Sequence, residues 1–406
     1  MKIFFISSKY PPYYDGGYEL KAYDVARELC KKGHDIYVLT SIYGVNKNSV
    51  DGNVYRVLNF NDMAGNNIKN YFKLFKSVFF DFNNYFITKK LLKRINPDIV
   101  YIWHSNYISI SPAIAAGVLG IPAVFHLEDY WLLGLKNSGS SFQNYFLRSL
   151  CKIISRFFFG ILKLKNIIVV SNTLKRKYME IGIQEEKIKL IKSGISTNTF
   201  SKTTKKEFGD KIRLLYTGRL SEEKGVNIAI EAVNYLIKGN QKNIILDIVG
   251  RGSNDYEKII KEKVHYHGIE NYINFLGMIE RELLPEIYCS HDILLVPSIW
   301  EEPFGLSAIE GMACGIVVIA SNVGALSETI VNGENGILVN PNDFKELSHW
   351  IVRVIRDKEL YESMQEKGIE IIKEKYTIQK HADSIEEYLK DICRGYNNIP
   401  FHKLSE

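Results

Sequence analysis

Short apolar segments alternate with longer amphipathic segments along almost the whole of this chain of 406 residues. Nearly continuous apolar strands separated by helices are typical of parallel sheets that helices cover on both faces. The sequence therefore predicts an α/β fold. We expect helices at Glu19–Lys32, Val226–Ile237 and Glu280–Cys289. The predicted strands are Lys2–Ser7, Asp35–Thr40, Asp98–Trp103, Ala123–His126, Asn166–Val170, Ile212–Thr217, Asn243–Val249, Ile273–Leu276, Asp292–Val296 and Ile316–Ala320.

The length of the chain favours two domains, because a single hydrophobic core rarely serves more than about 250–300 residues. A polar segment without apolar periodicity, residues 201–211, marks the boundary. We predict an N-terminal Rossmann-like domain at residues 1–200 and a C-terminal Rossmann-like domain at residues 201–380. Residues 381–406 are expected to form a C-terminal helix and tail that pack back on the N-terminal domain. In such sheets, ligands bind outside the carboxyl ends of the strands.

The composition excludes several classes of protein. An apolar content of 46% and a charged content of 24% are those of a folded globular protein. The five cysteines are scattered without any Cys-x-x-Cys pair, and their odd number argues against a disulfide framework. The first apolar run is too short for a signal peptide, and no run approaches the roughly 18 apolar residues of a membrane span. We therefore expect a cytoplasmic protein.

Positive charge is concentrated in the first half of the chain. Residues 1–200 contain 27 lysines and arginines against 14 aspartates and glutamates, whereas residues 201–406 contain 25 against 32. The segment 142–177 interleaves basic residues with large apolar ones, as in helices that lie on anionic membranes. A core-facing helix with solvated lysines gives the same pattern, so both interpretations stay open. No nucleic-acid-binding module is recognisable, and we expect no nucleic acid partner.

Two glycine-rich turns follow predicted strands. Gly16 and Gly17 lie between the first strand and the first helix, where an anion can approach backbone N–H groups and the helix dipole attracts it. An ordinary tight turn would look the same. Gly250, in the run Val-Gly-Arg-Gly-Ser, follows a later strand and is expected to line the floor of a nucleotide site. A single Gly-x-Gly is weak evidence.

A pair of cations follows the predicted strand Ile212–Thr217. Arg219 and Lys224 stand five residues apart in a turn that begins at Gly218 and leads into a helix. A diphosphate leaving group needs compensating positive charge, and a rigid arginine fork combined with the point charge of a lysine suits it. Two solvated surface cations are the alternative. The flanking glycines and the strand-to-helix position favour a binding role.

The most informative motif is the run Pro-Ser-Ile-Trp-Glu-Glu-Pro-Phe-Gly-Leu-Ser-Ala-Ile-Glu-Gly, which follows an apolar strand. Glu302 falls in a turn and Glu310 in the helix after it. We expect Phe304, Gly305 and Leu306 to present N–H groups at the helix start towards phosphate or sugar oxygens. Glu302 can accept hydrogen bonds from a sugar, and Glu310 from both ribose hydroxyls. The apolar neighbours make two solvated glutamates a poor alternative.

Together these motifs resemble those of the retaining glycosyltransferases of family 4, the group 1 glycosyltransferases, over nearly the whole chain. The most specific of them is the Glu-x7-Glu spacing of Glu302 and Glu310. The resemblance implies the GT-B fold, in which two Rossmann-like domains face each other across a cleft. It also implies transfer from a UDP- or GDP-linked sugar with retention at the anomeric carbon, without a metal or another cofactor.

The resemblance carries over to individual positions. In the family's usual account, the leaving diphosphate helps to deprotonate the acceptor on the same face, so no strong enzymatic base is obligatory. Metal independence agrees with the absence of an Asp-x-Asp motif. By position, the donor diphosphate is assigned to Arg219 and Lys224, the donor sugar to Glu302, the ribose to Glu310, and the phosphate or acceptor to Gly16 and Gly17.

The sequence departs from the family pattern in two places. The family often has His-Asp after a strand of the first domain, but here Glu128 stands at the usual histidine position and His126 lies two residues earlier. That spacing along a strand points both side chains to the same face, so either could meet the donor sugar. We predict both residues, together with Glu302, as catalytic residues. A buried, hydrogen-bonded histidine is the alternative for His126. The second departure, at Lys192–Ser196, concerns the hinge between the domains.

We predict a retaining, metal-independent glycosyltransferase that acts on a glycan or lipid-linked acceptor in bacterial surface polysaccharide synthesis. It would be cytoplasmic, with peripheral contact to an anionic membrane as an open question. Two other functions stay open, a GT-B nucleotide-sugar epimerase and a non-catalytic subunit that binds a nucleotide-sugar. The presence of both cations and both glutamates favours transfer, because degenerate subunits usually lose part of that set.

Overall fold

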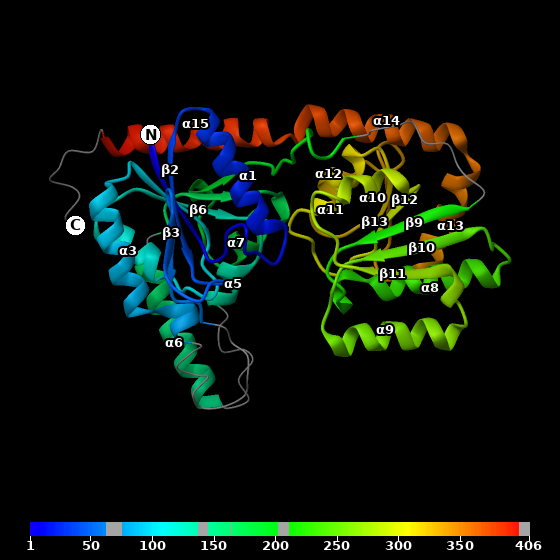
Figure 1. Cartoon of the computed structure of the whole chain (residues 1–406), viewed down its shortest axis with the longest axis horizontal. Helices are drawn as coiled ribbons and strands as arrows, with labels where there is room; N and C mark the ends of the chain where they lie inside the picture. Colours follow the sequence, from blue (N-terminus) through cyan, green and yellow to red (C-terminus); the bar gives the residue numbers. More distant parts are fainter. Residues whose placement is uncertain (62–74, 137–144, 163, 202–210, 398–406) are drawn as a thin grey trace. The chain divides into compact units, whose positions relative to one another are not determined.

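The computed structural model describes residues 1–61, 75–136, 145–162, 164–201 and 211–397, and it divides into two compact units (Figure 1). The first unit consists of Met1–Lys192 with Ile378–Glu406, and the second of Ser193–Thr377. Most of the polar segment predicted as a boundary, the end of the predicted tail and parts of the basic segment 142–177 lie outside the described residues.

The first unit contains the strands β1 (Lys2–Ser7), β2 (Asp35–Ser41), β3 (Ser49–Asp51), β4 (Val54–Leu58), β5 (Ile99–His104), β6 (Ala123–Leu127), β7 (Ile167–Val169) and β8 (Ile188–Leu190). They form one sheet of order β3-β4-β2-β1-β5-β6-β7-β8. Only β3 runs antiparallel to its neighbour among the described strands. All residues of β5 are buried, which agrees with its nearly continuous apolar sequence up to His104.

The helices of the first unit are α1 (Gly17–Lys31), α3 (Phe82–Ile95), α4 (Ser111–Val118), α5 (Trp131–Lys136), α6 (Tyr145–Ile161), α7 (Asn172–Glu180) and α15 (Ile378–Asn397). Although α15 comes at the end of the chain, it packs against α1, near the beginning. His34 Nε2 lies 2.9 Å from Glu386 Oε1, and Lys32 forms an ion pair with the same glutamate. Apolar residues of α1, β1, β5 and α15 share one core.

The second unit contains the strands β9 (Ile212–Thr217), β10 (Ile244–Val249), β11 (Ile273–Gly277), β12 (Ile293–Val296), β13 (Val317–Ser321) and β14 (Ile337–Val339). They form a parallel sheet of order β11-β10-β9-β12-β13-β14. Its helices are α8 (Val226–Lys238), α9 (Asn254–His267), α10 (Leu284–Ser290), α11 (Leu306–Ala313), α12 (Leu326–Thr329), α13 (Phe344–Arg356) and α14 (Lys358–Lys375). A second core, separate from the first, lies on this sheet.

Each predicted strand is present, with ends within one residue of those predicted. The prediction of a helix at Glu280–Cys289 was wrong at its start, because α10 begins at Leu284. Pro285 occupies the first turn of that helix, the position in which a proline is tolerated. Four short strands were not predicted, namely β3, β4, β8 and β14.

The strand order places one switch point in each sheet. In the first sheet the chain proceeds from β1 to β2 on one side and later to β5 on the other, so the order reverses between β1 and β5. In the second sheet it reverses between β9 and β12. Loops that leave the carboxyl ends of such strands diverge, and ligands of open α/β sheets bind in the crevice that results. The switch points are therefore where a site is expected.

Candidate active site

The switch point of the second unit carries a lysine and a glutamate that the sequence separates by 78 residues. Lys224 follows β9 and Glu302 follows β12, and the lysine Nζ lies 2.7 Å from Oε1 and 2.9 Å from Oε2 of the glutamate. Lys224 was predicted to bind the donor and Glu302 to be a catalytic residue facing the donor sugar, and the structure brings the two into direct contact. Their separate roles towards the diphosphate and the donor sugar stay predictions.

Glu302 is held by several donors at once. In addition to Lys224, the Ser298 hydroxyl donates to Oε1 over 2.5 Å and the Trp300 indole N–H donates over 3.0 Å. Only 4% of Glu302 is exposed, whereas about a quarter of the Lys224 side chain is. Charge-assisted hydrogen bonds of this kind fix the position of a buried carboxylate. The arrangement therefore orients Lys224, which keeps one N–H donor beyond the two that Glu302 accepts and is partly exposed.

The loops around this pair pack on one another through glycines. A Cβ on Gly225 would lie 1.9 Å from the carbonyl oxygen of Pro297, and the Ile299 N–H donates to the Glu223 carbonyl over 2.9 Å. The loop after β9 is thereby fixed to the loop after β12. Two glycines that were predicted for the site, Gly218 and Gly250, are also in close contact, because a Cβ on Gly250 would lie 1.8 Å from the Gly218 oxygen.

Arg219 and Glu310 lie on the same edge of the sheet but are held by other partners. Arg219 pairs with Glu223, and 62% of its side chain is exposed. The hydroxyl of Tyr288 donates to Glu310 Oε2 over 3.2 Å and lies 3.0 Å from the Thr217 hydroxyl. An exposed i,i+4 pair such as Arg219–Glu223 contributes little stability.

The start of α11 is built as the sequence predicts. Gly305 caps the helix with φ +88°, and Leu306 is its first residue. Phe304 is 5% exposed, and its ring contacts Tyr376 with centroids 6.0 Å apart. The carbonyl of Glu302 accepts the Ala325 N–H over 2.9 Å, which fixes the turn that precedes the helix. The first N–H groups of a helix lack intrahelical partners and carry partial positive charge.

In the first unit, the predicted glycine turn begins α1. Gly16 is the N-cap residue, in an extended conformation, and Gly17 is the first helical residue. Glu19, in the first turn, is only 7% exposed, and its burial raises its pKa. The turn lies directly after the loop that follows β1. It is therefore at the carboxyl edge of the first sheet, where the first unit is expected to contact a ligand.

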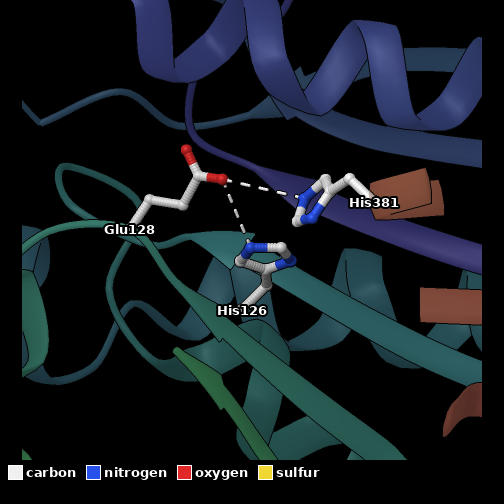
Figure 2. Close-up of side chains that lie close together, drawn as sticks. All are labelled: His126, Glu128 and His381. Atoms are coloured by element: carbon white, nitrogen blue, oxygen red, sulfur yellow. Dashed lines mark ion pairs between the residues drawn. The ribbon is translucent and has the colours of Figure 1, made fainter. Parts of the chain in front are cut away.

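His126 and Glu128 lie together with a third residue that the sequence did not suggest. Figure 2 shows one Glu128 oxygen between the rings of His126 and His381, at 3.4 Å and 3.9 Å from their Nε2 atoms. All three residues are buried. Burial alone would raise the pKa of Glu128, but the close contact with His126 and the positive charge of Lys21 lower it to about 2.

The buried cluster has its own source of positive charge. The three ligand atoms lie within 4.8 Å of one another, a spacing that a metal ion could use. However, Lys21 is 2% exposed and its charge acts on all three residues. One carboxylate cannot offset both an ammonium and a divalent ion in a buried pocket, because uncompensated charge is costly there. The chemistry of the cluster therefore fits an ammonium better than a metal ion.

Two family models together match most of the chain. The model described as Glycosyltransferase Family 4 matches residues 15–199, and that described as Glycosyl transferases group 1 matches residues 198–371. The chain belongs to glycosyltransferase family 4. It is 24% identical over 399 residues to an uncharacterised glycosyltransferase of Methanocaldococcus jannaschii, covering 93% of this chain and 95% of that protein. It is also 24% identical over 395 residues to N-acetyl-alpha-D-glucosaminyl L-malate synthase of Bacillus anthracis, covering 94% and 96%.

Solved structures show the same architecture. HepE of Anabaena, in complex with UDP and glucose, superposes with a TM-score of 0.70 at 20% identity, covering 96% of this chain and all of that one. Sucrose-phosphate synthase of Thermosynechococcus elongatus superposes with a TM-score of 0.74 at 20% identity, covering 97% and 99%. The glycosyltransferase thus has the GT-B fold of two Rossmann-like sheets and takes its sugar from a nucleotide-sugar.

Sequence reasoning missed three polar residues of this glycosyltransferase. His381 lies on α15, and nothing in the sequence connected it with Glu128. Asp129 directly follows Glu128, and His104 ends β5, yet neither was singled out. The signal for Asp129 was present, since it matches the aspartate of the family's His-Asp pair. The signal for His104 is the strand order, which only the structure provides.

Proposed function

We propose that this enzyme transfers a sugar from a nucleoside-diphosphate-sugar to a glycan or lipid-linked acceptor, with retention at the anomeric carbon and without a metal ion. The observation that carries the proposal is the Lys224–Glu302 pair at the switch point between β9 and β12. A lysine held by a buried glutamate beside a helix start is suited to a diphosphate. Arg219 and the N–H groups at Gly305 and Leu306 would supply further positive charge.

The roles of the remaining site residues follow from this placement. Glu310, already a hydrogen-bond acceptor for Tyr288, would accept from the ribose hydroxyls. Gly218 and Gly250 have no side chains that would keep a nucleotide from the ends of β9 and β10. The complex of HepE with UDP-glucose supports a UDP-linked donor. Synthesis of a bacterial surface polysaccharide remains the pathway that we propose for the acceptor.

A thermal-shift screen with UDP- and GDP-sugars tests donor binding. A ligand at 100 times its Kd stabilises the native state by about 2.7 kcal/mol, which is readily measured as a rise in Tm. We expect one nucleotide class to raise Tm in the wild type and not in Lys224→Ala. Lys258→Ala, which changes an exposed lysine of α9, is the matched control. If no nucleotide-sugar raises Tm, the proposed donor site is wrong.

Turnover distinguishes transfer from the alternative functions. A transferase releases free nucleoside diphosphate and forms a glycoside, whereas an epimerase converts the donor without releasing the nucleotide. A non-catalytic subunit does neither. The donor selected by the thermal-shift screen, incubated with octyl glucosides and with lipid extracts as acceptors, should therefore give free nucleoside diphosphate. Epimerised donor in the absence of an acceptor would favour the epimerase.

We further propose that the acceptor is reached from an anionic membrane, which the first unit contacts through α3 and α6. Phe82 and Phe86 of α3 are 67% and 62% exposed, and Ile153 and Phe157 of α6 are 66% and 63% exposed. Ring contacts connect these helices, since Phe80 contacts both Phe82 and Phe158. α3 also carries the bases Lys89, Lys90, Lys93 and Arg94. In the described residues, no helix is long and apolar enough to span a membrane.

Vesicle flotation tests this contact. The double variant Phe82→Ser/Phe157→Ser should lower binding to phosphatidylglycerol vesicles at least about tenfold, because each buried phenylalanine contributes about 1.5–3 kcal/mol. Both side chains are exposed, so the fold should persist. Tyr266→Ser, which removes an 85% exposed aromatic of the second unit, is the control. Equal flotation of both variants and the wild type would contradict the membrane contact.

A further inference from the structure

Two cysteines that lie 25 residues apart in the sequence meet where α10 packs against α11. Cys289 is near the end of α10, and Cys314 is the C-cap residue of α11. The Cys289 thiol donates to the carbonyl of Cys314 over 3.8 Å and to that of Ser201 over 3.6 Å. The two thiols are also in hydrogen-bond contact with each other. Both helices belong to the second unit, so the pair lies within one compact body.

The two thiols differ in accessibility and acidity. Cys289 is half-buried, whereas Cys314 is buried. The hydrogen bond with Cys289 and burial raise the pKa of Cys314, and the charges of Cys289 and Glu310 raise it further. A thiol attacks other sulfurs as its thiolate, so Cys314 is a poor first nucleophile. Cys289 is therefore the thiol that a small molecule from solution meets first, and Cys314 is placed to react second.

The cysteine pair lies next to the residue predicted to bind the ribose. Cys314 follows Glu310 by one helical turn, and its N–H donates to the Glu310 carbonyl over 3.2 Å. Tyr288, the residue before Cys289, donates its hydroxyl to Glu310 Oε2 over 3.2 Å. The same hydroxyl lies 3.0 Å from the Thr217 hydroxyl at the end of β9. Both thiols are thus connected to Glu310, one through α11 and the other through Tyr288.

We propose that Cys289 and Cys314 are a modification site, a dithiol that a small-molecule disulfide converts reversibly into an intramolecular disulfide, and that this bond weakens donor binding at Glu310. The first part of the proposal depends only on the two thiols. The second part rests on the donor site proposed above, because Glu310 is assigned there to the ribose hydroxyls.

The exchange consists of two substitutions at sulfur. The Cys289 thiolate attacks one sulfur of the small-molecule disulfide, and the other sulfur leaves with the electron pair of the broken bond. The Cys314 sulfur, after losing its proton, attacks the Cys289 sulfur of the mixed disulfide, and the second small thiolate leaves in the same way. The cysteine pair is oxidised by two electrons, and the small-molecule disulfide is reduced to two thiols, which carry the two protons that the cysteines lost.

The new bond draws the end of α10 towards the end of α11. A covalent bond holds two sulfurs closer together than a hydrogen bond does, and a close-packed interior transmits such a shift to its neighbours. Tyr288 is 1% exposed and adjacent to Cys289, so its hydroxyl moves with the helix. Glu310 then loses the donor that orients its carboxylate. A misoriented carboxylate makes poor hydrogen bonds with ribose hydroxyls, and the affinity for the nucleotide falls.

Peptide mapping of the full chain tests the first part. The protein is equilibrated with mixtures of reduced and oxidised glutathione at about pH 8, where more of each thiol is ionised, and the remaining thiols are alkylated. Digestion at glutamates separates the two cysteines, since Glu301 and Glu310 lie between them. Mass spectrometry should detect a cross-link between Cys289 and Cys314 that dithiothreitol removes. Unmodified thiols, or glutathione adducts without this cross-link, would overturn the proposal.

The affinity for nucleotide tests the second part. Titration with the nucleotide selected by the thermal-shift screen should give a Kd at least about tenfold higher for the cross-linked wild type than for the reduced protein. Cys289→Ser keeps a hydroxyl that can donate to the same two carbonyls, and its Kd should not change with the glutathione mixture. Cys30→Ser, which replaces the exposed cysteine of α1, is the matched control and should lose affinity on oxidation as the wild type does.

The outcomes separate this proposal from the proposed function. If the cross-link forms and the Kd of the wild type stays the same, the bond does not act on Glu310 and the second part is wrong. If oxidised Cys289→Ser loses as much affinity as the wild type, another cysteine causes the loss, which also contradicts the second part. If the reduced wild type binds no nucleotide-sugar, the proposed donor site fails, whereas the peptide map still decides whether Cys289 and Cys314 form the disulfide.

Discussion

Replacing Lys224 by alanine should lower kcat by about 10²-fold or more. The diphosphate gains negative charge as its bond to the sugar breaks, and a positioned cation stabilises that charge in the transition state. Lys224 is positioned by both oxygens of Glu302 before any ligand binds, so little reorganisation is needed. Steady-state kinetics with the selected donor measure the loss, and the ratio of kcat/KM values converts it into lost transition-state stabilisation.

The same change also leaves Glu302 without its counter-charge. Ser298 and Trp300 still donate to it, but a buried carboxylate that loses its cation destabilises the fold. The double variant Lys224→Met/Glu302→Gln therefore serves as the control for stability, because it removes both charges and keeps the volumes similar. It should fold and remain inactive. Wild-type kcat in a folded Lys224→Ala protein would contradict the assignment of Lys224 to the donor diphosphate.

The Lys224–Glu302 contact also marks the limit of what the sequence predicts. Both residues were identified from their motifs, and each strand before them was placed within one residue. Their contact was not predicted, because it depends on β9 and β12 being neighbours. Strand order in a sheet is a long-range property that apolar periodicity does not contain. The motifs therefore identified the candidate residues, and only the strand order showed that two of them lie in contact.

Contacts in the first unit depend even more on parts of the chain that are distant in sequence. Burial, and then the charges of Glu128 and of Glu19 on α1, raise the pKa of Asp129, and its carboxylate faces His104, which ends β5. Glu128 was expected to be a candidate for contact with the donor sugar. The structure buries it against His126 and against His381 of α15, 253 residues later in the chain. The packing of a helix from the end of the chain cannot be inferred from the local sequence of the segment that it contacts.

Replacing Gly225 by alanine should lower the free energy of unfolding of the second unit by several kcal/mol and abolish the nucleotide-induced rise in Tm. Gly225 has φ +69°, and its added Cβ would lie 1.9 Å from the Pro297 oxygen, a backbone atom that cannot move by itself. The loop after β9 must then separate from the loop after β12, and Lys224 moves away from Glu302. Urea denaturation and the thermal-shift screen measure the two effects.

Gly333→Ala separates the cost of the left-handed backbone conformation from the cost of the steric contact, both of which act at Gly225. Gly333 has a comparable φ of +81°, but a Cβ there would meet nothing within 4 Å. The left-handed conformation alone costs an alanine about 1–2 kcal/mol, so Gly333→Ala should lose about that much stability and keep its response to nucleotide. The excess loss in Gly225→Ala then measures the contact between the two loops. If both variants lose the same stability and both still bind nucleotide, that contact does not hold the site together.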